Sequence, residues 1–167
     1  MDLASTTAIA AQALAHPPID VIILFALFLV MLVDGMRSGV ARPATFSVSL
    51  PLTLLITTLL PHTAIIGPML EKVSTPYIDA ALFGGIFVAL SFLIYRILCS
   101  AGVLVASTLT AVVASACVVV IFVAVWLHVP ALQHVWHFSP LIETVFGSPY
   151  TAWWLILGFL GMGFVRS

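Results

Sequence analysis

Three histidines gather in one polar stretch of the sequence, and imidazole is the side chain that most often binds transition metals. His134 and His137 stand three residues apart, a spacing that places both on one face of a helix, and His128 precedes them. Metal sites usually complete such a set with cysteine or carboxylate ligands. Glu143 is the only acid in this stretch, so the pattern favours ordinary interfacial histidines over a metal site.

Asp34 is the second residue whose type carries chemistry, because a carboxylate buried in a membrane is costly and usually serves an ion or proton path. It closes an apolar run and lies about one turn before Arg37, with Arg42 further along. This position favours an interfacial carboxylate paired with Arg37 or Arg42. Asp20 and Asp79 are expected at helix ends that water reaches, which disfavours a carboxylate-driven pump and leaves open a pore formed by oligomerisation.

Motifs of the common enzyme chemistries are not found in the sequence. It contains no glycine-rich phosphate loop, no GxSxG elbow and no HExxH pair. No spacing of serine and histidine builds a nucleophile with its base. We therefore expect a protein that is not an enzyme and binds no cofactor.

Membrane helices are the elements that must position these residues. The chain is 63% hydrophobic and 7% charged, with a mean hydropathy of +1.28, which is too apolar for a water-soluble surface. The sequence predicts an all-α integral membrane protein with a single polytopic domain over residues 1–167. We expect five spans, at residues 18–36, 44–60, 76–98, 101–127 and 149–165, and four if the last segment does not cross.

The segments between the spans are expected to be short. "PHTAIIGPMLEKV" is broken by Gly67 and Pro68 and predicts a re-entrant or interfacial piece. Ser139-Pro140 predicts the start of a short interfacial helix on the outer side. The turn "CSAG" predicts a tight antiparallel hairpin of the third and fourth spans.

The basic and aromatic residues predict an orientation. Basic residues concentrate in cytoplasmic loops, and an outer N-terminus places Arg37, Arg42, Arg96 and Arg166 on the inner side. The four tryptophans, together with Tyr77 and Tyr150, gather at the opposite interface. We therefore expect the C-terminus in the cytoplasm.

Small residues repeat at every fourth position of the fourth span, at Gly102, Ala106, Thr110 and Ala114. Such stripes let membrane helices approach closely. The expected partner is the third span near Gly84, Gly85 and Ala89, or a second protein molecule.

The stretch "IDVIILFALFLVMLVDGMRSGVAR" resembles the start of the colicin V production protein family of bacterial inner-membrane proteins. Asp20 matches the acid that leads the first helix. Gly35, Arg37 and Gly39 match a glycine, basic, glycine turn, and Arg42 matches the basic residue after it. Asp34 departs from that pattern. The polar stretch "HFSPLIETVF" is similar in position to a serine-containing outer segment of the family.

The resemblance implies a role in envelope maintenance or export, in the bacterial inner membrane. Two other classes stay open: an accessory subunit of a larger membrane complex, and a small homo-oligomeric channel or transporter. The expected partners are the lipid bilayer together with other membrane subunits or further copies of the chain. The formal charge of −1 gives no basic surface for nucleic acid.

Overall fold

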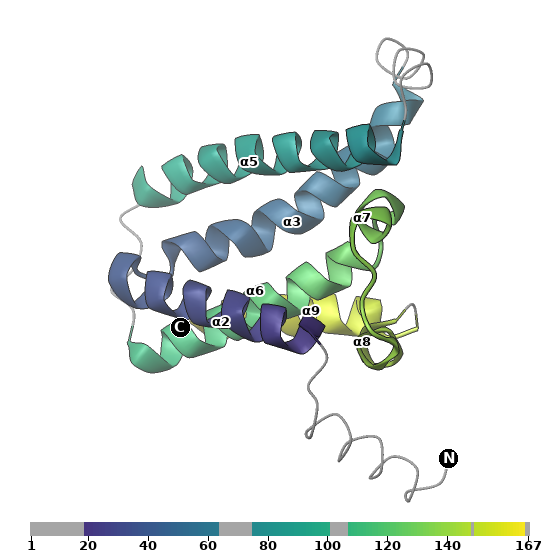
Figure 1. Cartoon of the computed structure of the whole chain (residues 1–167). Helices are drawn as coiled ribbons and strands as arrows, with labels where there is room; N and C mark the ends of the chain where they lie inside the picture. The colour runs from purple at the N-terminus through teal and green to yellow at the C-terminus, as the bar shows by residue number, and fades with distance from the viewer. Residues whose placement is uncertain (1–18, 64–74, 101–106, 148, 166–167) are drawn as a thin grey trace, which may run out of the picture.

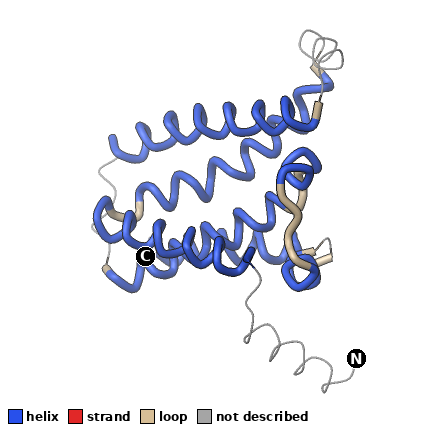
Figure 2. Tube along the Cα trace, viewed as in Figure 1, coloured by secondary structure: helices blue, strands red, loops and turns tan. Residues whose placement is uncertain are grey.

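The computed structural model describes residues 19–63, 75–100, 107–147 and 149–165, and every regular element in these ranges is helical (Figure 2). The all-α class is confirmed. In chain order the elements are α2 (Ile19–Ser38), α3 (Ala41–Leu59), the 3-10 turn η1 (Leu60–His62), α5 (Pro76–Ser100), α6 (Thr108–Trp126), α7 (Pro130–Val135), α8 (Pro140–Phe146) and α9 (Thr151–Val165).

Four of these helices are long and apolar enough to cross a membrane. They are Ile19–Ser38, Ala41–His62, Pro76–Leu98 and Thr108–Trp126. The last helix, α9, has 15 residues. At 1.5 Å per residue it rises about 22 Å, short of the ~30 Å hydrocarbon core. The described part of the chain thus has four helices of spanning length, and the expected fifth span is a shorter apolar helix.

The helices alternate in direction along a common axis (Figure 1). α2, α5 and α9 begin at the end of the molecule that holds α7 and α8, whereas α3 and α6 begin at the opposite end. Arg37, Arg42 and Arg96 lie near that opposite end, which we call the arginine end. The other end, which we call the aromatic end, holds Tyr77, Trp126, Trp136, Tyr150, Trp153 and Trp154.

α6 lies at the centre of the bundle. It packs on α9, α2 and α3, whereas α5 packs on α3 and α7. Ile121 and Val125 of α6 form the main core with Leu50, Phe83 and the start of α7. The expected tight packing of α6 against α5 near Gly84, Gly85 and Ala89 is wrong, because α5 packs on α3 and α7 and leaves Gly84 and Gly85 facing open space. The join itself, residues 101–106, lies outside the described residues.

Most hydroxyl side chains inside α3 donate to its own backbone. The hydroxyls of Thr45, Ser49 and Thr53 each donate to the carbonyl four residues earlier, at 2.7 Å. This pattern hides hydroxyls from an apolar surrounding. The buried Oγ of Ser47 has no partner. Pro51, four residues later, has no N–H to donate to the carbonyl of Ser47.

α9 fits against α6 through glycines. A Cβ added at Gly158 would stand 2.7 Å from Cγ1 of Ile121, and one added at Gly161 would stand 2.5 Å from Sγ of Cys117. Only hydrogen fits at these two positions, so the two helices approach closely.

Candidate functional site

Asp20 connects the start of α2 to a segment more than a hundred residues later. Its Oδ1 accepts from Nε1 of Trp136 at 2.9 Å, and its Oδ2 accepts from the backbone N–H of Ser139 at 2.5 Å. Asp20 is only 7% exposed. The expectation that water reaches this carboxylate is therefore wrong, because the segment around Ser139 folds over it.

Two features favour the carboxylate in this place. Asp20 lies in the first turn of α2, where the helix dipole stabilises a negative charge. Its two hydrogen bonds are charge-assisted and so are stronger than neutral ones. Asp20 therefore fixes the segment between α6 and α9, residues 127–147, which we call the cap.

Tryptophans hold the rest of the cap on the bundle. Nε1 of Trp126 donates to the carbonyl of Trp136 at 3.1 Å, and Nε1 of Trp154 donates to the carbonyl of Val145 at 2.8 Å. Phe138 is buried with its ring centroid 6.0 Å from that of Trp126. The cap is thus anchored from α2, α6 and α9.

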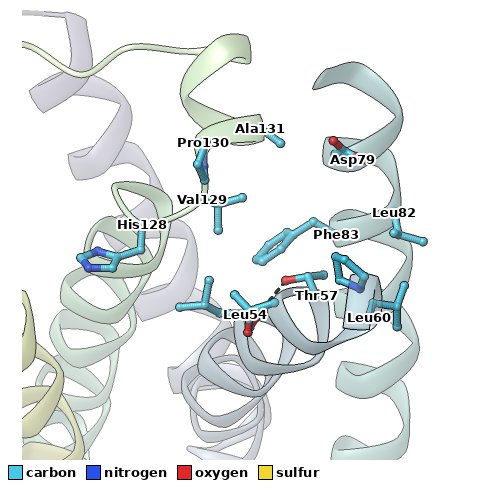
Figure 3. A pocket seen from close by; sticks show the side chains of 12 residues that line it. Leu54, Thr57, Leu60, Asp79, Leu82, Phe83, His128, Val129, Pro130 and Ala131 are labelled. Carbon is cyan, nitrogen blue, oxygen red and sulfur yellow. Dashed lines mark hydrogen bonds between the residues drawn. The ribbon is translucent and has the colours of Figure 1, made fainter. Parts of the chain in front are cut away.

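A cavity of about 310 Å³ lies beside the cap, between the end of α3, the start of α5 and the start of α7 (Figure 3). Phe83 and Asp79 reach into it from α5, and Val129 faces them from the cap. The hydroxyls of Thr57 and Thr58 in its wall donate to backbone carbonyls of α3. Most of its lining is apolar, which suits an apolar occupant better than a polar substrate.

The three histidines lie apart in this region. His134 is in the last turn of α7, and that helix ends at Val135, so His137 does not share its helical face. All three are exposed, and the imidazole of His128 points away from Phe83 (Figure 3). Within the described ranges no three histidine, cysteine or acidic residues lie close enough to hold a metal ion.

The glycine, basic, glycine turn lies at the arginine end and joins α2 to α3. Gly39 has a φ of 77°, a left-handed conformation that favours glycine. Gly35 is buried, and a Cβ added there would lie 3.5 Å from Pro43 and 3.7 Å from Ala111. The backbone conformation therefore favours glycine at position 39, whereas a Cβ at Gly35 would make only ordinary van der Waals contacts and Arg37 is exposed.

Asp34 pairs with Arg42 across this turn. Nη1 of Arg42 donates to Oδ1 of Asp34 at 2.6 Å, and Oγ of Ser38 donates to the same oxygen at 3.2 Å. This confirms the expected pairing with one of the two arginines. The Arg42 guanidinium also lies 5.7 Å from the ring centre of Tyr95.

The small residues expected to mediate helix packing have different surroundings. Ala114 is fully buried and Thr110 is half-buried near the start of α6. Gly102 and Ala106 lie outside the described residues.

No family model, curated protein or solved structure matches this chain.

The bond from Asp20 to the cap is the functional feature that sequence reasoning missed. The cap carries one local signal for it, Trp136, whose indole N–H can donate to a carboxylate. The contact between Asp20 and the cap could not be predicted from the sequence, because more than a hundred residues separate them.

Proposed function

We propose that the chain is a non-enzymatic multi-pass protein of the bacterial cytoplasmic membrane, of the colicin V production type, with a role in envelope maintenance or export. The proposed role is the one that the resemblance to this family implies. The hydrogen bond between Asp20 and the backbone N–H of Ser139 supports the resemblance. Asp20, which matches the leading acid, accepts from the backbone N–H of Ser139 at 2.5 Å, and Ser139 belongs to the stretch that is similar in position to the serine-containing segment.

The protein acts by binding other molecules in the membrane. α5 supports this mode of action, since only 6% of its most apolar stretch is buried by the rest of the chain. Gly84 and Gly85 on this helix face open space, with no atom within 4 Å of an added Cβ. Small residues on an uncovered helix are typical of contacts between membrane helices.

An accessory subunit of a larger membrane complex is the second candidate, and the same uncovered face of α5 favours it. In both cases we propose an outer N-terminus and, with α9 as a short fifth crossing, a C-terminus in the cytoplasm. This orientation is supported by the arginines near one end and the tryptophans near the other.

The test begins with the gene. Its deletion should make the host sensitive to detergents or reduce export of a secreted reporter, and the wild-type gene should restore both. Asp20→Asn should restore less than the wild type, whereas Glu143→Gln, an exposed acid of the same cap, should restore fully. A deletion strain with an intact envelope and normal export would contradict the proposal.

Purification in a gentle detergent separates the candidates. A stoichiometric set of other membrane proteins, lost on Gly85→Leu and kept on the matched Gly163→Leu, would favour the accessory subunit. Both glycines face open space in the isolated chain, so neither change should disturb its fold. A homo-oligomer that conducts ions in vesicles would favour a channel instead.

A further inference from the structure

A groove of about 550 Å³ lies near the arginine end, with α3 as its floor and α2 and α5 as its walls. α2 packs mainly on α6 and α5 packs mainly on α3, so the two walls stay apart. The volume lies within the ~300–1,000 Å³ range of small-molecule sites. The groove opens sideways between membrane-spanning helices, where lipid is the surrounding medium.

The groove is polar at one end and apolar along the rest. Arg42 and Tyr95 lie at its polar end, near the ends of α3 and α5. Val30, Phe46 and Phe92 line it one turn or so deeper in the bundle. A phospholipid has the same arrangement, with a polar headgroup at the membrane surface and apolar acyl chains deeper in the bilayer.

Arg42 retains capacity for a ligand. Its hydrogen bond to Asp34 uses one N–H of a guanidinium that carries five, and the side chain is 46% exposed. Guanidinium groups bind phosphate oxygens with two parallel N–H bonds. The ion pair and Tyr95 therefore orient Arg42 without exhausting its donors.

Charge at this end favours an anion. Among the described residues near it, Arg37, Arg42 and Arg96 stand against Asp34, three positive charges and one negative, which leaves a formal charge of +2. Basic clefts between membrane helices on the cytoplasmic side are typical binding sites for anionic lipid headgroups.

A second, independent observation points to a ligand. Oγ of Ser91 is buried, lines the groove and has no hydrogen-bond partner. Buried hydroxyls are nearly always paired, and of the unpaired ones in the described residues Ser91 is the one that lines this groove, where an oxygen of a ligand would supply the missing partner. Ser91 lies one turn deeper than Tyr95, at the depth of the glycerol esters of a lipid whose phosphate is on Arg42.

We propose that this groove binds one anionic phospholipid. The phosphate accepts hydrogen bonds from Arg42, an ester oxygen accepts from Ser91, and one acyl chain lies along Val30, Phe46 and Phe92. A helix from another protein fits these features less well, because it would need an acceptor facing Ser91 and an anion facing Arg42 inside the membrane.

Native mass spectrometry of the full chain in a non-ionic detergent tests the proposal. Phosphatidylglycerol should bind about tenfold more tightly than phosphatidylcholine with the same acyl chains. Arg42→Gln should weaken phosphatidylglycerol binding about tenfold, and Arg37→Gln, the same charge change outside the groove, by less than threefold. Asp34→Asn should preserve or strengthen binding, because it removes the competing negative charge.

A second pair of variants tests the acyl-chain part without touching the ion pair. Val30→Trp should displace both lipids, whereas Val33→Trp on the same helix should displace neither, and both valines are exposed enough to accept the larger ring. The proposal is overturned by equal binding of the two lipids, by displacement of phosphatidylglycerol with inorganic phosphate, or by a co-purified protein that Val30→Trp releases.

Discussion

Removing the charge of Asp20 should loosen the cap. In Asp20→Asn the side chain keeps its shape but offers one acceptor oxygen and one NH2 group. The two donors that face it are Nε1–H of Trp136 and N–H of Ser139, so one of them must meet a donor. The substitution therefore breaks one bond and weakens the other.

The magnitude follows from the two bonds. Losing a hydrogen bond to a charged group costs about 1.5–3 kcal/mol, and converting the second bond from charged to neutral costs about 1 kcal/mol. Trp136 is 41% exposed, so water compensates in part if its N–H is the donor left over. We expect a net loss of about 2–3 kcal/mol in the free energy that holds the cap on α2.

Hydrogen exchange of the cap amides measures this free energy directly. A loss of 2–3 kcal/mol should speed exchange in residues 127–147 by roughly 30- to 160-fold where exchange proceeds through opening of the cap. Glu143→Gln is the matched control, since it removes the same charge from an exposed position of the cap and should change exchange little. If the cap amides exchanged as slowly in the Asp20→Asn variant as in the Glu143→Gln variant, the anchoring role of Asp20 would be refuted.

Three further changes test the packing, each by unfolding in detergent. Gly158→Ala should cost about 1–3 kcal/mol, because the new Cβ would stand 2.7 Å from a side-chain carbon of the fully buried Ile121, whereas Gly163→Ala faces open space and should stabilise α9 slightly. Gly39→Ala should cost about 1–2 kcal/mol, since its φ of 77° strains any residue with a Cβ; an unchanged midpoint would contradict the left-handed turn. Ser47→Ala should leave stability unchanged or raise it, because the buried hydroxyl has no partner to lose; a loss above about 1 kcal/mol would mean that Ser47 binds something the helices enclose.

Hydropathy was sufficient to predict the long helices, because a helix that crosses a membrane needs a long run of apolar residues. The four helices of spanning length, the short helix that begins after Ser139 and the pairing of Asp34 with one of its two nearby arginines all follow from local patterns, whereas the fifth predicted span is the shorter α9. Segments within about ten residues of each other have few ways to meet. Local sequence therefore carries most of the information about them.

Helix neighbours could not be predicted in the same way. The sequence places α6 directly after α5, yet α6 packs on α9, α2 and α3. In lipid every apolar face can be covered equally well, so shape rather than hydrophobicity selects the partner. The fit of Gly158 against Ile121 is such a feature of shape, and its effect is visible only when both helices are in place.

The burial of Asp20 is the other feature that the sequence hides. A carboxylate at the start of a membrane helix is normally hydrated, and only the cap, which folds back over it, supplies the donors that replace water. Because the helices alternate in direction, the start of α2 and the cap lie at the same end of the molecule.

The proposed topology places the arginine end of the molecule in the cytoplasm and the cap outside. Single cysteines at Ser38 and His137, both exposed in the structure, test it in a background without Cys99 and Cys117. In intact cells a membrane-impermeant maleimide should label the cysteine at position 137 and leave the one at position 38 unlabelled until the membrane is opened. Labelling of both positions from the outside, or of position 38 alone, would contradict the proposed topology.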